Sequence, residues 1–417
     1  MGAWFEILRR HRVMRASAAA IFLYGFAGAA TSPYQSLIAI RELGMSDRGY
    51  AALALASSLA YVVMAIGVGM ISDRFRSYRR PLIFVSAFGI LGYGMVWAFP
   101  SVPMFALATL APLALFHSTN SMLFGNVKAH SAQFDAEEAR ISNALMRIMI
   151  SLSWVVMPGA VGLMLNGRQS MIAAYLIAAL VAAAILLVVL FWMEPDVTPA
   201  VSAPEPSPHT TRKASSAPMR KRSAQPAALQ DLRLVMDPAL LVRVFGVALI
   251  SQMLHVNSAV LPLIVTGRAQ GQPEDVGFLV GLVAVLEVIF MFFWARATRK
   301  LAITHALLIC SALYLGYLGA IALASAPWHV YLASCLAGFA AAGMISLPIN
   351  YLLDLIKDRP GLSASLIAVN MFAGGALAAA VFALGTIFGG YGLAAVLSGV
   401  AGCVGAGVLM FLEAKPR

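Results

Sequence analysis

Two charged side chains lie inside stretches that are otherwise apolar enough to form membrane helices. Arg147 falls early in a run that also contains Trp154 and Pro158, and Glu287 falls deep in a later run. A charge in the bilayer core costs about 3 kcal/mol or more, so such residues usually pair, face water or carry out a function. Burial favours a neutral carboxyl group and a nearby guanidinium favours the charged form, so Glu287 could exchange protons. We therefore interpret Arg147 and Glu287 as substrate-binding or proton-coupling residues.

A purely structural role is the alternative for both residues. Arg147 could extend its guanidinium to the headgroups, and Glu287 could be a static buried group. Further polar side chains in the apolar runs could hydrogen-bond a polyol, while an indole offers an apolar face to a sugar ring. Each of them could equally hold two packed helices together. The candidates for substrate contact are Gln35, His117, Asn120, Trp154, His255, Asn257 and Asn370.

The composition is that of a polytopic membrane protein. Of the 417 residues, 61% are hydrophobic and only 11% are charged, and the mean hydropathy is +0.84. These values exclude a soluble globular domain. The net charge of +11 comes from short basic loops between apolar runs, so the expected partner is the lipid bilayer and not nucleic acid. The three cysteines show no zinc spacing, and we expect neither a metal site nor a cofactor.

Runs long enough to cross about 30 Å of hydrocarbon recur along the chain. They predict an all-α polytopic membrane protein with twelve transmembrane helices in two pseudo-symmetric six-helix bundles. The bundles occupy residues 1–193 and 239–417, and residues 194–238, rich in Pro, Ala and Ser, form a flexible linker. The predicted spans are residues 17–40, 50–71, 81–99, 103–127, 140–165, 170–193, 239–266, 276–295, 303–324, 328–353, 362–388 and 391–412.

The basic residues predict the orientation. If both termini lie inside, the termini, the linker and the inner loops carry 23 of the 29 Lys and Arg residues, and the outer loops carry 4. Cytoplasmic loops of membrane proteins hold the excess of Lys and Arg. Both termini and the linker are therefore expected in the cytoplasm.

The two halves share features that indicate an internal duplication. Pro33 is followed by Asp47, and Pro262 is followed by Asp275, with each aspartate at the start of the next predicted span. We expect both aspartates to cap the N-termini of these helices. Duplicated bundles with a substrate site between them are typical of transporters.

A basic loop between the second and third spans could lock the halves in one state. An aspartate at the end of one helix can bind arginine side chains and the N-terminus of a neighbouring helix. The alternative is a simple positive-inside signal with one incidental acid. The loop resembles the signature of the major facilitator superfamily, Gly-x-x-x-Asp-Arg-x-Gly-Arg-Arg, with two additional residues and an arginine in place of the second glycine. The candidate gating residues are Gly69, Asp73, Arg74, Arg76, Arg79 and Arg80.

Within that superfamily the chain is similar to the bacterial sugar efflux transporter family. The fifth span matches the family pattern at Met146-Arg147 and Pro158, and the eighth matches it at Gly277-Phe278-Leu279 and Leu286-Glu287. One position departs from the pattern: Val260 stands where family members can carry an acid, two residues before the proline of the seventh span.

This resemblance implies a secondary transporter and not an enzyme. It implies a monomer in the bacterial inner membrane that exports small sugars or glycosides by alternating access, in antiport with protons. The main alternative is a multidrug or other small-molecule exporter. A polytopic membrane enzyme is disfavoured because the aqueous loops lack a carboxylate cluster or a His–acid pair. A receptor or scaffold is disfavoured by the duplication and the buried charges.

Overall fold

The computed structural model describes residues 2–75, 78–130, 134, 136–168, 170–194, 237–356 and 360–414. Twelve helical stretches in these ranges are long and apolar enough to cross a membrane. The prediction of an all-α fold with twelve spans is therefore confirmed. The interior of the predicted linker lies outside the described residues.

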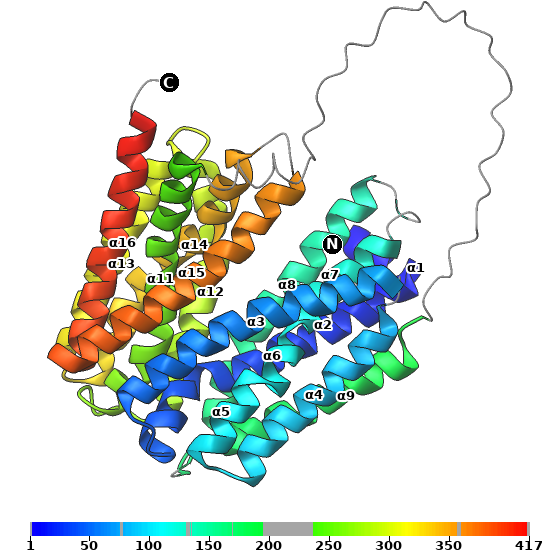
Figure 1. Ribbon diagram of the computed structural model, residues 1–417, viewed down its shortest axis with the longest axis horizontal. Coiled ribbons are helices and arrows are strands. Elements are labelled where there is room, and N and C mark those ends of the chain that lie inside the picture. The colour runs from blue at the N-terminus through cyan, green and yellow to red at the C-terminus, as the bar shows by residue number, and fades with distance from the viewer. Residues whose placement is uncertain are drawn as a thin grey trace, which may run out of the picture.

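The helices form two bundles that follow each other along the chain (Figure 1). The first contains α1 (Gly2–Arg10), α2 (Arg12–Thr31), α3 (Asp47–Phe75), α4 (Arg79–Ala98), α5 (Val102–Leu110), α6 (Pro112–His117), α7 (Thr119–His130), α8 (Ala136–Met164) and α9 (Ala173–Phe191). The second contains α11 (Pro238–Thr266), α12 (Pro273–Ala297), α13 (Ile303–Leu323), α14 (Pro327–Leu355), α15 (Pro360–Phe388) and α16 (Gly390–Ala414). We call the end that carries the last turns of α9 and α16 the terminal end, and the opposite end the far end.

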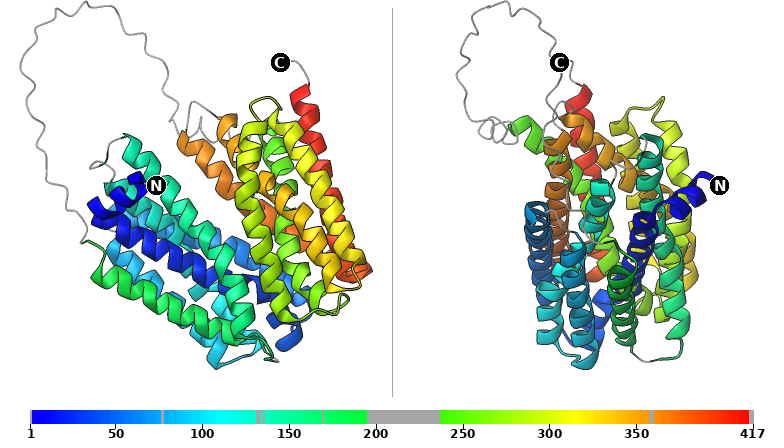
Figure 2. Two further views of the ribbon diagram at one scale, coloured as in Figure 1. Left: turned by 180° about the vertical axis from the view of Figure 1, so that it is seen from behind. Right: turned by 90° about the vertical axis from the view of Figure 1, so that its right-hand side faces the viewer.

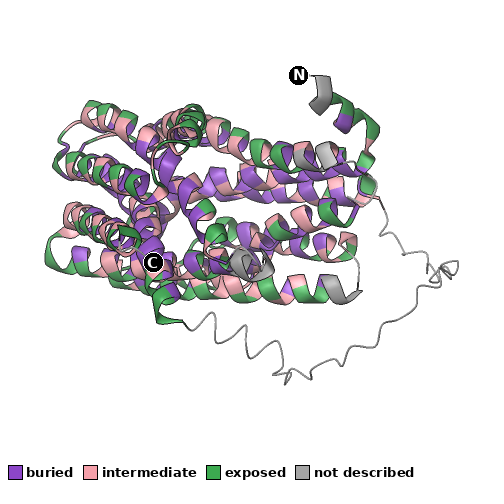
Figure 3. Cartoon of the chain, turned by 90° about the horizontal axis from the view of Figure 1, so that it is seen from above, coloured by how far each residue is buried: buried purple, intermediate pink, exposed green. Residues whose placement is uncertain are grey.

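Two helix pairs join the bundles, because α8 packs on α12 and α3 packs on α15. The bundles meet toward the far end and diverge toward the terminal end when seen from the front and from behind (Figure 1 and Figure 2, left). Buried residues follow the faces that the helices turn to one another, and exposed residues follow the outer faces (Figure 3). At the closest approach, a Cβ added to Gly277 of α12 would collide with the Pro158 carbonyl of α8 and with the Tyr34 hydroxyl. Only glycine permits this contact.

The first and fourth spans, predicted as continuous helices, are interrupted. After α2 the chain forms a 3₁₀ turn, η1 (Ser32–Tyr34), and a π-helical segment, η2 (Leu37–Glu42). Pro33 lacks a backbone N–H, which breaks the regular helical ladder. The fourth span is divided at Ala111 and Ser118 into α5, α6 and α7. Irregular backbone at membrane depth is tolerated where it packs against protein or lines a cavity.

The two repeated aspartates have different roles. Asp275 caps α12 as predicted, because its Oδ2 accepts a hydrogen bond of 2.8 Å from the backbone N–H of Gln272. At the start of α3 the cap is Ser46, whose Oγ accepts from a backbone N–H at 3.1 Å. Asp47 instead accepts a 2.9 Å hydrogen bond from the Tyr391 hydroxyl of the other bundle. The capping prediction is wrong for Asp47, since Ser46 already occupies the N-cap position.

Candidate functional site

Two cavities lie between the bundles, on either side of the interrupted first span. The polar cavity, of about 250 Å³, lies between α3 and α15 and reaches α11. The tryptophan cavity, of about 420 Å³, lies between α8 and α12 and reaches α11, α13 and α14. Gln35 lines the former and Pro33 the latter, while Ser258 of α11 lines both. Between them the buried Ser36 hydroxyl donates a 2.7 Å hydrogen bond to the Ala259 carbonyl, which joins the two bundles.

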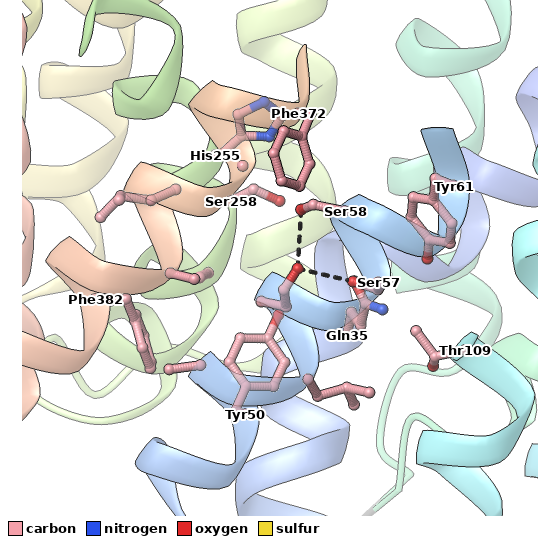
Figure 4. Close-up of a pocket in the computed structure, with 18 of the residues that line it drawn as sticks. Gln35, Tyr50, Ser57, Ser58, Tyr61, Thr109, His255, Ser258, Phe372 and Phe382 are labelled. Carbon is pink, nitrogen blue, oxygen red and sulfur yellow. Dashed lines mark hydrogen bonds between the residues drawn. The ribbon is translucent and has the colours of Figure 1, made fainter. Parts of the chain in front are cut away.

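The polar cavity presents neutral hydrogen-bonding groups from both bundles. Figure 4 shows Ser57, Ser58 and Tyr61 from α3 on one side and His255 from α11 on the other. The hydroxyls of Ser57 and Ser58 both donate to the Ala54 carbonyl, at 3.0 and 2.9 Å, so their oxygens can still accept hydrogen bonds. Among the described lining residues there is no carboxylate, lysine or arginine. The polar lining residues are Gln35, Tyr50, Ser57, Ser58, Tyr61, Thr109, His255 and Ser258.

The tryptophan cavity combines an apolar wall with a few polar groups. Trp154 enters it from α8, and Glu287 enters it from α12. Asn257 lines it from α11, and its Oδ1 accepts a 2.9 Å hydrogen bond from the Tyr317 hydroxyl. That bond leaves the amide Nδ2 of Asn257 as a donor. Sequence reasoning therefore identified three residues that the fold brings to one cavity.

Two prolines add backbone acceptors next to the cavities. Pro158 and Pro262 lie inside α8 and α11. Proline has no N–H, so the carbonyls four residues earlier lose their helical partners. These carbonyls belong to Trp154 and Ser258, which are both cavity-lining residues. The two prolines thus free one backbone acceptor on α8 and one on α11.

Three other predicted contact residues lie outside both cavities. The Nδ1 atom of His117 lies 3.0 Å from the Tyr24 hydroxyl. Its ring centroid lies 4.6 Å from that of Tyr61, so His117 packs behind a residue that lines the polar cavity. Asn370 donates to the Ser251 hydroxyl at 3.0 Å, and Asn120 is half-buried on α7. In this conformation His117 and Asn370 bond to neighbouring helices, and none of the three lines either cavity.

Arg147 and Glu287 are not paired in this conformation. Arg147 is exposed on α8, lines neither cavity and makes no ion pair with Glu287. The reason is the divergence of the bundles toward the terminal end, where Arg147 lies one helical turn beyond Ser151 of the tryptophan cavity.

In the described part of the gating loop, Arg79 contacts α9 of its own bundle. The guanidinium of Arg79 donates to the carbonyls of Val189 at 3.3 Å and Leu190 at 2.7 Å, in the last turn of α9. Cations are favoured at the carbonyl end of a helix, which explains these two contacts of Arg79. The gating role of the loop stays a prediction. Gly69 is half-exposed and Arg80 is exposed on the helices flanking the loop. Arg76 and the side chains of Asp73 and Arg74 lie outside the described residues.

Sequence reasoning missed the hydroxyl-bearing face of α3. Tyr50, Ser57, Ser58 and Tyr61 all line the polar cavity. The two serines and Tyr61 follow Tyr50 by seven, eight and eleven residues, which places all four on one face of a helix. This spacing could have been recognised in the sequence.

Comparisons with known proteins agree with this architecture. A sequence model described as Major Facilitator Superfamily matches residues 17–379. The chain is 25% identical over 399 residues to a protein of Deinococcus radiodurans named "Putative sugar efflux transporter", covering 95% of this chain and 97% of that one. The crystal structure of the nucleoside transporter NupG is similar in fold, with a TM-score of 0.78, 12% identity, and coverage of 97% of this chain and 100% of that chain. The peptide transporter POT in complex with sulfate gives a TM-score of 0.72 and 14% identity, with coverage of 97% and 94%.

Proposed function

Since the chain belongs to the major facilitator superfamily, and is therefore a multi-pass membrane transporter, we propose that it exports small sugars or glycosides in exchange for protons. The observation that carries the sugar assignment is the polar cavity, whose lining is rich in hydroxyl groups and free of carboxylate, lysine and arginine among the described residues. A neutral polyol matches such a lining better than an ion does. Ser258 lines both cavities, so in this proposal the sugar extends from the polar cavity to Trp154 and Glu287 in the tryptophan cavity. The name of the Deinococcus relative supports the same assignment.

The charge distribution and the conformation are consistent with loading from the cytoplasm, as export requires. The 23 to 4 bias of basic residues supports a cytoplasmic terminal end in a bacterial inner membrane. The far end is closed by the Gly277–Pro158 contact and by the Asp47–Tyr391 and Ser36–Ala259 hydrogen bonds. The terminal end is the side toward which the bundles diverge. In this conformation a monomer would load its substrate from the cytoplasm.

The antiparallel register of α8 and α12 supports a conformation-dependent ion pair. Gly162 lies against Glu274, and Val155 lies against Gly281. From the Val155–Gly281 contact, eight residues toward the terminal end lead to Arg147 on α8 and to residue 289 on α12. Arg147 therefore lies at the depth of residue 289. Residue 289 lies two residues, or about 3 Å along the helix axis, closer to the terminal end than Glu287. Closure of the terminal end would therefore bring the two charges to the same depth.

Such a pair provides a basis for coupling. When the far end opens and the terminal end closes, Arg147 holds the deprotonated carboxylate of Glu287. A proton taken up from the far side neutralises Glu287 and breaks the pair, so the terminal end opens again. The proton leaves from the cytoplasmic side once a sugar uses the carboxylate as a hydrogen-bond acceptor. Sugar and proton then exclude each other at Glu287, which is the condition for antiport.

One observation favours a second candidate function. The tryptophan cavity is lined mainly by aliphatic side chains and holds a single carboxylate, which suits a lipophilic cation of the kind that multidrug exporters carry. Counterflow in proteoliposomes separates the two functions, with labelled sugars and glycosides in one series and labelled hydrophobic cations in the other. We expect exchange of at least one sugar or glycoside. Exchange of the cations alone would replace sugar export with multidrug export.

A further inference from the structure

The turn between α12 and α13 carries a basic hollow that the proposed transport cycle does not use. The hollow has a volume of about 440 Å³ and is lined by Phe293, Arg296, Ala297, Arg299 and Lys300. Its three cationic side chains are exposed. Within the described part of the chain, none of the three makes a side-chain hydrogen bond or an ion pair. Three positive charges thus surround one hollow, and none of them has a counter-ion among the described residues.

Three other basic residues at the terminal end have structural partners. Arg12 donates to the carbonyls of Phe191 and Trp192, both at 3.2 Å. Arg79 binds the neighbouring carbonyls of α9, and Arg243 lies 3.4 Å from the Glu413 carboxylate. These contacts neutralise the ends of helices or pair charges within a bundle. The cations of the hollow serve neither purpose, although the loop corresponds to that of Arg79 in the duplicated half.

The stripe of α12 that leads to the hollow faces away from the transport cavities. Ile289, Phe293 and Arg296 follow each other at intervals of four and three residues, so they share one face of the helix. The residues nine positions before them all line the tryptophan cavity: Val280, Ala284 and Glu287. Nine residues equal two and a half helical turns, so the stripe lies on the side of α12 opposite the cavity. Ile289 is 55% and Phe293 is 50% exposed, as expected for side chains in contact with lipid.

We propose that the basic hollow binds the headgroup phosphate of an anionic phospholipid, whose acyl chain lies along Phe293 and Ile289. Guanidinium groups match the geometry of phosphate oxygens, and the lysine adds a point charge. The part of α12 that carries these residues is anchored on α14. Trp294 is buried there, and its indole N–H donates a 2.9 Å hydrogen bond to the Phe339 carbonyl of α14. The apolar stripe directly beneath the cations selects a lipid over a free phosphate ion.

The test is the affinity of the detergent-solubilised full-length protein for phosphatidylglycerol, measured by native mass spectrometry. In detergent the insertion orientation has no influence on the result. We expect the variant Arg296→Gln/Arg299→Gln/Lys300→Gln to lose affinity by a factor on the order of 100, at about fivefold per charge, with unchanged binding of phosphatidylcholine. Each single substitution is expected to show the fivefold loss. The variant Arg296→Lys/Arg299→Lys keeps the charges and is expected to retain most of the affinity, which separates loss of binding from misfolding.

A matched control removes the same charge elsewhere. Arg9, Arg48 and Arg168 are also exposed, and their side chains have no partner in the described part of the chain. The triple glutamine variant at these positions is expected to keep the wild-type affinity. An equal loss in both triple variants, or no loss in the variant of the hollow, overturns the proposal. Competition by inorganic phosphate at the concentration of the lipid also overturns it and identifies free phosphate as the ligand. The readout involves no transport, so its outcome is independent of the proposed sugar export.

Discussion

Trp154 and Glu287 reach one cavity from different bundles, and each brings a distinct chemistry to it. The indole offers an apolar face that can cover the C–H face of a sugar ring, while the carboxylate can accept hydrogen bonds from hydroxyl groups. Asn257 adds an amide donor, oriented by its bond to Tyr317. A ligand held between these groups contacts both bundles, so its binding is coupled to their relative position.

Truncation of Trp154 tests the contact with substrate. Trp154→Ala removes the apolar face, and a loss of about 1–2 kcal/mol of binding would raise the half-saturating sugar concentration roughly 5- to 30-fold. Trp154→Phe keeps an aromatic face and is expected to have a much smaller effect. Counterflow rates at increasing sugar concentration measure both variants. An unchanged half-saturating concentration in Trp154→Ala would remove the indole from the site.

The sequence indicated which polar residues could form the candidate site, but not which of their side chains point into a cavity. Trp154, Asn257 and Glu287 stand out in apolar runs and do line a cavity. Asn120 and Asn370 stand out equally in the sequence and lie between helices instead. A polar side chain in a membrane helix can satisfy its hydrogen bonds toward a neighbouring helix or toward a cavity. Only the packing of the helices decides between the two.

Among the elements, α3 and α16 provide one of the hydrogen bonds that link the bundles at the far end, from Tyr391 to Asp47 at 2.9 Å. The duplicated half contains a similar bond, in which the Tyr331 hydroxyl donates to Asp275, also at 2.9 Å. The second bond stays within one bundle, since both α12 and α14 belong to it. The two hydroxyl–carboxylate bonds thus have the same length, but only the bond between Tyr391 and Asp47 must break when the far end opens.

Loss of the first bond is expected to open the far end. Tyr391→Phe removes a hydrogen bond to a charged group, worth about 1.5–3 kcal/mol, and should shift the conformational equilibrium by roughly 10- to 150-fold. The distance between spin labels at Arg48→Cys and Ser325→Cys, one in each bundle, reports the change when the native cysteines are replaced. Tyr331→Phe is the control and should leave the distance distribution unchanged. Identical distributions for Tyr391→Phe and the wild type would mean that the bond does not hold the far end.

The extent of the elements was predictable from apolar length, but their interruptions were not. The eighth span was expected at residues 276–295 and is the helix Pro273–Ala297. The first span was expected to be continuous, yet it changes to 3₁₀ and π-helical backbone after Thr31. Pro33 alone indicates a possible kink. The π-helical segment also depends on contacts with the other bundle, such as the bond from Ser36 to Ala259, and these contacts are not encoded locally.

At the scale of the whole molecule, the two bundles form a carrier with one closed end and one end toward which they diverge. The twelve spans and their duplication were predictable, because the hydrophobic runs and the repeated Pro–Asp spacing are local features of the sequence. The division of the interface into the polar cavity and the tryptophan cavity was not predictable. It results from the register of α3 against α15 and of α8 against α12.

The central claim is that Glu287 couples sugar export to proton entry. It is tested most directly by sugar accumulation in inverted membrane vesicles with an acidic interior, whose outer face corresponds to the cytoplasm. The wild type is expected to concentrate a sugar that it exchanges in counterflow. Glu287→Gln is expected to lose accumulation while keeping counterflow, because the amide preserves the shape of the side chain but cannot bind and release a proton. Accumulation by Glu287→Gln at the wild-type level, or a wild type that does not respond to the proton gradient, would contradict the account.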